Sequence, residues 1–226
     1  MKNDVNHTTS ESNDALKDKQ LATERIDVLT VEQQQELIEK YDTEANMRKI
    51  AGVMKWVIFI GLLAFSLFQL YTAIFGQFTA YIQRSIHLGF GLTFVFLLFP
   101  SRKKGRKDRI PFYDYLLALV AAVTGAYWTI NYDRLVTSLG TITQMDFIVG
   151  LIVILLVLEA ARRSVGLPIA IIAVLFLAYA IYGQYMPDIF AHRGQSLEQL
   201  VNLMYYSTDG ILGTPISVSA TYIRSE

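Results

Sequence analysis

Residues 165–186 read VGLPIAIIAVLFLAYAIYGQYM, a run of 22 residues without a single charge. A helix needs about 20 apolar residues to cross the roughly 30 Å hydrocarbon core of a bilayer. Pro168 lies near the start of this run, where a proline does not remove a helical hydrogen bond because the first N–H groups have no partner there. The stretch therefore predicts a membrane-spanning helix.

Four further apolar runs precede this one along the chain. Some of their flanking residues also suit a bilayer: Arg84 can extend its side chain to the lipid headgroups, and Tyr127, Trp128 and Tyr132 are typical of an interfacial aromatic belt. A soluble protein does not contain so many such segments in one short stretch, so we predict an all-α integral membrane protein with about five transmembrane helices. The four runs are Trp56–Phe75, Ser85–Phe99, Phe112–Ile130 and Phe147–Leu158. Tyr81–Arg84 can extend the second run, and uncharged residues extend the fourth on both sides.

The basic residues predict the orientation of these spans. Cytoplasmic loops of membrane proteins carry an excess of lysine and arginine. All the dense basic clusters fall on one side if the N-terminus is cytoplasmic, and we favour this topogenic role over nucleic-acid binding for the basic loop after the second span. That loop contains Arg102, Lys103, Lys104, Arg106, Lys107 and Arg109, and the other clusters are Arg48, Lys49 and Lys55 before the first span and Arg162 and Arg163 after the fourth.

The first 50 residues differ in composition from the rest. They carry seven basic and eleven acidic residues, whereas the remainder carries thirteen basic and nine acidic ones, so the zero net charge is a cancellation. Residues 1–28 are polar and predict a disordered cytoplasmic tail without a cleavable signal peptide. Thr30 and Gln33 form a capping-box pattern, and residues 29–50 predict an amphipathic helix on the membrane surface.

The pattern changes again after residue 186. Ser196 and Gln199 form a second capping box, and an apolar stripe follows that predicts an amphipathic helix on the outer side; the stripe comprises Leu197, Leu200, Val201 and Met204. Ile211–Ile223 then offers only 13 residues, too few to span a bilayer, before the sequence stops at Glu226. We expect a truncated sixth element here.

The most distinctive group of charged residues lies at the end of the fourth span. Glu159 precedes Arg162 and Arg163 by three and four residues, so both guanidinium groups can reach the carboxylate on one helix face. We expect a structural ion pair at the helix end, with a place in an ion or substrate path as the alternative. Asp114 and Asp146 begin the third and fourth spans, where the helix dipole favours carboxylates.

Several function classes find no support in the residues. The chain has no cysteine, its three histidines are scattered, and no nucleophile–base set, metal-ligand pattern or P-loop is present. We therefore expect no catalytic site, no metal site and no organic cofactor. Ala118, Ala122 and Ala126, with Ala121 and Gly125 beside them, predict close helix packing. These features favour a transport or assembly component of a membrane over a membrane enzyme.

One family resemblance goes further. The segment LEAARRSVG, Leu158 to Gly166, with the apolar run that follows it, resembles the fused permease of tripartite ATP-independent periplasmic (TRAP) transporters that work with TAXI-type solute receptors. Other stretches agree with this family in order along the chain. They are ELIEKYDTEANMRKIAG (Glu36 to Gly52), RSIHLGF (Arg84 to Phe90), FLLFP (Phe96 to Pro100), PFYDYLLAL (Pro111 to Leu119) and TDGILGTPISVSATYI (Thr208 to Ile223).

The resemblance implies a function that composition alone does not give. In such systems an extracytoplasmic solute-binding protein delivers an organic acid or amino acid to a permease of the bacterial inner membrane, which moves it inward with sodium ions. The family implies that residues 51–164 form a small bracing domain of four helices. Residues 165–226 would add a fifth helix, the outer amphipathic helix and the start of a large permease domain, which holds the substrate and sodium sites. The alternative is a stand-alone scaffold subunit for a separately encoded permease.

Overall fold

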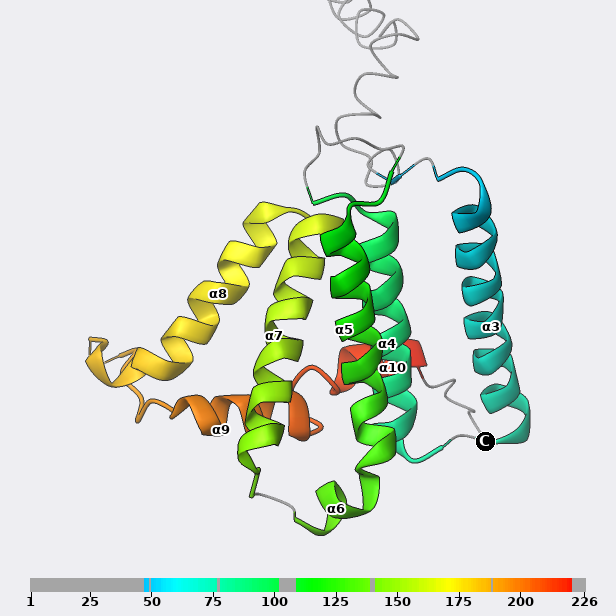
Figure 1. Ribbon diagram of the computed structural model, residues 1–226. Helices are drawn as coiled ribbons and strands as arrows, with labels where there is room; N and C mark the ends of the chain where they lie inside the picture. Colours follow the sequence, from blue (N-terminus) through cyan, green and yellow to red (C-terminus); the bar gives the residue numbers. More distant parts are fainter. Residues whose placement is uncertain are drawn as a thin grey trace, which may run out of the picture. The chain divides into compact units, whose positions relative to one another are not determined.

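The computed structural model describes residues 47–48, 50–76, 78–101, 109–138, 141–187 and 189–220 (Figure 1). The chain divides into two units, Met1–Asn46 and Met47–Glu226, and every described residue belongs to the second unit. The predicted tail, most of the predicted surface helix and residues 102–108 of the basic loop lie outside the described residues. Met47, Arg48 and Ile50, at the end of the predicted surface helix, are not helical.

The described residues form helices and contain no strand. Their order is α3 (Val53–Phe75), α4 (Ala80–Leu98), α5 (Phe112–Ile130), α6 (Tyr132–Thr137), α7 (Gln144–Ser164), α8 (Leu167–Tyr182), the 3-10 turn η2 (Gly183–Tyr185), α9 (Leu197–Val201), the π-helical turn η3 (Asn202–Tyr206) and α10 (Thr214–Ala220). Four of these helices, α3, α4, α7 and α8 with η2, are long and apolar enough to cross a membrane. This is the all-α, multi-pass architecture that the uncharged runs predict.

The third apolar run also forms one helix, but its composition sets it apart. Helix α5 has 19 residues, as many as α4, yet it is not among the four helices that qualify by both length and hydropathy. It carries Asp114 in its first turn and several tyrosines along its length. Length and composition together therefore support four spans in the described residues, and a fifth rests on the packing of α5.

Helices α4 and α5 cross at two glycines. A Cβ atom added to Gly89 would lie 2.8 Å from the Cα of Gly125, and one added to Gly125 would lie 2.5 Å from the Cα of Gly89. Small residues on this helix predicted close packing, and the buried ones among them make it here. Ala118 and Ala121 are buried beside Gly125, whereas Ala122 is exposed. Residues on one face of a helix are spaced three and four residues apart, so a strict repeat of four moves away from that face.

Helix α7 packs against the segment α9–η3, which runs across it rather than alongside it (Figure 1). Gly150 makes room for this crossing, since a Cβ there would lie 2.5 Å from the side chain of Val201. The capping box at Ser196 is present as predicted, with Gln199 N–H donating to Ser196 Oγ at 3.1 Å. The predicted apolar stripe is only partly buried, because Leu197 is exposed.

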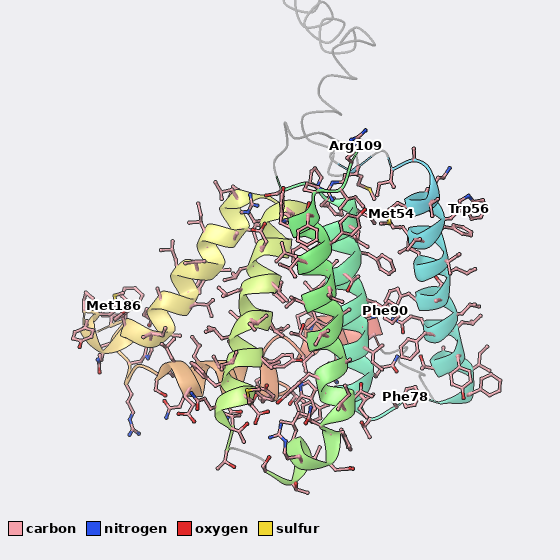
Figure 2. All side chains as sticks on the ribbon, viewed as in Figure 1. Met54, Trp56, Phe78, Phe90, Arg109 and Met186 are labelled. Carbon is pink, nitrogen blue, oxygen red and sulfur yellow. The ribbon has the colours of Figure 1, made fainter. Side chains whose placement is uncertain are left out.

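Helices α3 and α8 leave most of their apolar surface uncovered. In α8 only Ala170 is buried, and α3 meets α4 through a few contacts such as the stacked rings of Phe65 and Phe90. Figure 2 shows Phe90 extending into the space between α3 and α4. Chain direction changes between α7 and α8 at Gly166, whose φ of 126° is one that favours glycine. The exposed apolar faces suit contact with lipid or with another membrane helix.

Candidate functional site: buried ion pairs at both ends of the helices

Asp114 joins three parts of the chain through one buried carboxylate. Its Oδ1 accepts a hydrogen bond from Arg163 Nη1 at 2.7 Å, and its Oδ2 accepts one from Arg48 Nη2. All three side chains are almost fully buried. Arg48 precedes α3, Asp114 begins α5 and Arg163 lies in the last turn of α7, so the carboxylate fixes these elements to one another.

The helix ends explain why these residue types lie here. The N-terminal turn of α5 carries partial positive charge and the C-terminal turn of α7 partial negative charge, which favours Asp114 and Arg163 at their positions. Arg48 also caps the end of α4. Its Nη1 donates to the carbonyl oxygens of Phe96 at 3.2 Å and Leu97 at 3.0 Å, and its backbone N–H donates to Leu98 O at 2.9 Å.

Glu159 extends this network toward the helix surface. Arg162 donates to it from Nε and Nη2, and Arg163 donates from Nε, each at 2.7 Å. The two ion pairs lie at the spacings of three and four residues that the LEAARR sequence contains. We call Arg48, Asp114, Glu159, Arg162 and Arg163 the inner network. Its charges face one another in four ion pairs.

A second buried carboxylate, Asp146, lies in the first turn of α7. Asp114 and Asp146 therefore lie at opposite ends of the helix pair α5 and α7. Arg134 donates to both of its oxygens at 2.6 and 2.8 Å, and Tyr127 Oη donates at 2.6 Å. Asp146 also completes a capping box with Thr143. The hydrogen bonds to Asp146 raise the pKa of Arg134, so this guanidinium stays charged. We call Tyr127, Arg134, Thr143 and Asp146 the outer network.

Aromatic packing surrounds the outer network and corrects one prediction. Trp128 is 1% exposed and stacks on Tyr81 with ring centroids 4.5 Å apart, while Tyr206 lies on its other side at 5.8 Å. The expected interfacial belt is therefore wrong for Trp128, which packs between helices instead of facing lipid headgroups. Tyr206 Oη donates to the carbonyl oxygen of Asp146 at 2.8 Å, and burial raises the pKa of this tyrosine.

A third group of polar side chains holds α10 against α4. Arg84 donates to the carbonyl oxygen of Leu212 at 2.9 Å and to Ser217 Oγ at 2.8 Å. Gln83 is 1% exposed and donates to Ala220 O and Thr72 Oγ1, each at 3.1 Å. Arg84, which was expected to extend to the headgroups, is half-buried, and its guanidinium donates to the turn before α10 and to a hydroxyl group of α10.

Each of these groups joins separate parts of the chain through hydrogen bonds. Within the described residues, no three His, Asp or Glu side chains come together in a way that could hold a metal ion. The buried carboxylates are each paired with arginine, and Gly166 acts through backbone conformation. Of the predicted basic loop only Arg109 is described, and it is exposed.

Sequence reasoning missed the residues that complete the networks. Arg48 was assigned only to a basic cluster before the first span, and Arg134 was given no role, although each pairs with a buried carboxylate. No local signal could identify them, since Arg48 lies 66 residues from Asp114 and Arg134 lies 12 residues from Asp146. Gln83 was missed for another reason: in a hydropathy profile, it counts only as an unfavourable polar residue within a span.

The family-like stretches of the sequence meet in space. The stretches around Arg48, Phe96, Asp114 and Glu159 supply the inner network, and those around Arg84 and Ser217 supply the contacts that hold α10. Comparisons of the chain with protein-family models, with curated proteins and with solved structures found no match.

Proposed function

We propose that this chain is the membrane-embedded bracing portion of a TRAP-type secondary transporter. In this proposal the complete system takes up organic acids or amino acids across the bacterial inner membrane with sodium ions and an extracytoplasmic solute-binding protein. The large permease portion carries out transport, and the chain described here holds it in place. The chain has five spans with a cytoplasmic N-terminus, so that the inner network lies on the cytoplasmic side.

The observation that carries the proposal is the convergence of the family-like stretches. Residues that are far apart in the sequence, such as Arg48, Asp114 and Arg163, belong to separate stretches that resemble the same family, and they form one buried network. The contacts show that these stretches belong to one folded unit. The order of the stretches along the chain and their place in one buried network support the proposal together.

The state of the charges favours bracing over transport by this portion. Moving an ion or substrate across a membrane requires polar groups that can exchange partners along a path. The buried carboxylates Asp114 and Asp146 are instead held by arginines at opposite ends of the same helices. Helices α3 and α8 present long exposed apolar faces, which offer surface for docking a partner helix within the bilayer.

Co-purification tests the proposal. An affinity-tagged chain, produced in its native membrane and extracted in mild detergent, is expected to bring down a large multi-span permease and, with substrate present, a soluble extracytoplasmic receptor. Proteoliposomes that contain the chain alone are expected to show no sodium-dependent uptake above empty vesicles. Capture of no membrane partner, or clear uptake by the chain alone, would contradict the proposal.

The alternative is a stand-alone scaffold subunit for some other membrane protein. The uncovered face of α8 motivates it, because such a face suits any apolar helix of matching length. The same experiment separates the two ideas, since this alternative expects a partner that is not a secondary transporter.

A further inference from the structure

An apolar recess of about 540 Å³ lies between α3, α4 and α5. Its wall on α3 begins at Val57, near the start of that helix, and its wall on α4 runs from residue 86 to residue 97. The wall on α5 lies between residues 122 and 130. In Figure 2, Phe90 extends into the space between α3 and α4, whereas the exposed Trp56 points away from α4. Three helices therefore enclose a space that their own side chains do not fill.

The recess exists because small residues form much of its wall. Five of the lining residues are glycine or alanine, namely Gly61, Gly89, Ala122, Gly125 and Ala126. The ring of Phe94 reaches the backbone of α3 at Gly61, where an added Cβ would lie 3.0 Å from it. Helix α3 is thus held one aromatic ring away from α4, while α4 and α5 touch at their glycines.

The described walls of the recess give a ligand almost nothing to hydrogen-bond. Their only polar side chains are Thr93 and Thr129, and none of them carries a charge. Thr93 Oγ1 already donates to the carbonyl oxygen of Gly89 at 2.7 Å, and Thr129 lies in the last turn of α5. Apolar cavities in proteins stay dry. In a bilayer the recess therefore takes up hydrocarbon rather than water.

The size of the recess separates the two kinds of hydrocarbon that a membrane offers, a lipid chain and a helix of another protein. At 1.5 Å per residue the wall on α4 is about 16 Å long. An α-helix with its side chains is about 10 Å across, so a segment of that length occupies roughly 1,300 Å³, more than twice the recess. A single acyl chain is far thinner, and about 16 Å is close to half of a ~30 Å hydrocarbon core, the depth of one leaflet. Volume and length both favour the acyl chain.

A charged residue lies where the headgroup of such a lipid would be. Lys55 is in the first turn of α3, three residues before the buried, recess-lining Ile58, so the two side chains lie on the same side of the helix. Lys55 is exposed and forms no ion pair with another described residue. A lysine at the end of a membrane helix extends its ammonium group to the level of the headgroups, where it can pair with a phosphate.

We propose that this recess holds one acyl chain of a phospholipid, whose phosphate pairs with Lys55. The lipid joins α3 to the α4–α5 pair inside the bilayer, where α3 has little protein contact of its own. Only Ile58 and Thr72 of that helix are buried. The lipid site requires only that these three helices lie in a bilayer, so a chain that captures no permease still holds the lipid.

Native mass spectrometry of the purified full chain in detergent, titrated with dipalmitoyl phosphatidylglycerol, tests the proposal. One lipid per chain is expected to bind more tightly than any other and to raise the unfolding temperature, because a ligand of the folded state alone stabilises it. Ala122→Phe places a ring in the recess and is expected to weaken this binding by about tenfold or more, since the lipid buries less apolar surface. Val123→Phe, at an exposed neighbouring residue that does not line the recess, is the matched control and keeps full binding.

Lys55→Gln tests the phosphate contact. It is expected to weaken binding of the same lipid by about tenfold, because a hydrogen bond to a charged group is lost. The unfolding temperature of the lipid-free variant should not change, since Lys55 is exposed. Arg109→Gln, which removes an exposed charge before α5, is the control and keeps full binding.

Three outcomes would overturn the proposal. Equal lipid affinity in Ala122→Phe and Val123→Phe would remove the acyl chain from the recess. Equal affinity in Lys55→Gln and the unaltered chain would remove the phosphate from Lys55. Capture of a membrane protein by Val123→Phe but not by Ala122→Phe, with the same lipid binding in both, would assign the recess to a partner helix.

Discussion

Asp114 is the residue on which the inner network depends, because it is the shared partner of two buried arginines. A buried ion pair contributes little net stability compared with apolar side chains, but removal of one partner costs about 3–5 kcal/mol because the remaining charge stays buried. Without Asp114, Arg48 would lose its carboxylate partner, whereas Arg163 would keep its ion pair with Glu159. The attraction between the charges therefore adds little net stability, whereas breaking the network would leave a buried charge without its partner and would cost more.

We expect Asp114→Asn to destabilise the chain by about 3 kcal/mol or more, since an amide keeps the shape of the carboxylate but not its charge. A loss of 1 kcal/mol lowers the unfolding temperature of a chain of this size by about 2–4 °C, so thermal unfolding in detergent should show a shift of roughly 6 °C or more. The control is Asp133→Asn, an exposed aspartate on α6, with an expected change within about 0.5 kcal/mol. Equal unfolding temperatures for Asp114→Asn and the unaltered chain would show that the buried arginines find other partners.

At the scale of the helices, the contact of Gly89 with Gly125 sets the distance between α4 and α5. We expect Gly125→Ala to destabilise this pair by about 1–3 kcal/mol, because its Cβ would lie 2.5 Å from backbone atoms that cannot move aside alone. Gly91→Ala, on α4, is the matched control: a Cβ there meets nothing within 4 Å. Alanine forms helix better than glycine by about 1 kcal/mol, so this variant should be neutral or slightly more stable.

Thermal unfolding of the two alanine variants in the same detergent makes the comparison. Nearly equal unfolding temperatures for Gly125→Ala and Gly91→Ala would mean that α4 and α5 are not in close contact at these glycines. The expected order is Gly91→Ala at or above the unaltered chain and Gly125→Ala below it.

Helix positions and helix partners differ in how far the sequence predicts them. Uncharged runs located α3, α4, α7 and α8, since a bilayer-crossing helix needs a fixed length of apolar residues. The ion pairs of Glu159 follow from spacing on one helix. Which helix faces which does not follow, because α8 is apolar all round and gives no contrast between a lipid face and a protein face.

Because the sequence does not show which helix faces which, it also led to errors at individual residues. Arg84 and Trp128 were assigned to the lipid interface because their types and positions suit it, yet Trp128 is buried and the half-buried Arg84 donates to distant parts of the chain. Their partners, Leu212 and Tyr206, come from the segment after α8, more than 70 residues further along the chain. Long-range partners are set by tertiary packing, and a single sequence carries no record of them.

At the scale of the whole molecule, the two ion-pair networks decide whether α5 crosses the membrane. Its first turn is tied to the last turn of α7 through Asp114 and Arg163, and its last turns are tied to the first turn of α7 through Tyr127 and Asp146. Helix α5 therefore extends over the same distance as α7, which is long and apolar enough to cross. If α7 crosses, then α5 crosses in the opposite direction.

Single cysteines test this directly, because the chain has none of its own. We expect Arg109→Cys, before α5, to react with a membrane-impermeant maleimide only after intact cells are permeabilised. Asp133→Cys, after α5, is expected to react in intact cells, and both positions are exposed, so burial does not limit the reaction. Ala51→Cys, before α3, serves as the reference for the predicted cytoplasmic side, because α3 and α4 together return the chain to it. Reaction of Arg109→Cys and Asp133→Cys on the same side would mean that α5 does not cross. In that case α7 would cross the bilayer without α5, and the hydrogen bonds that join the ends of the two helices would have to break.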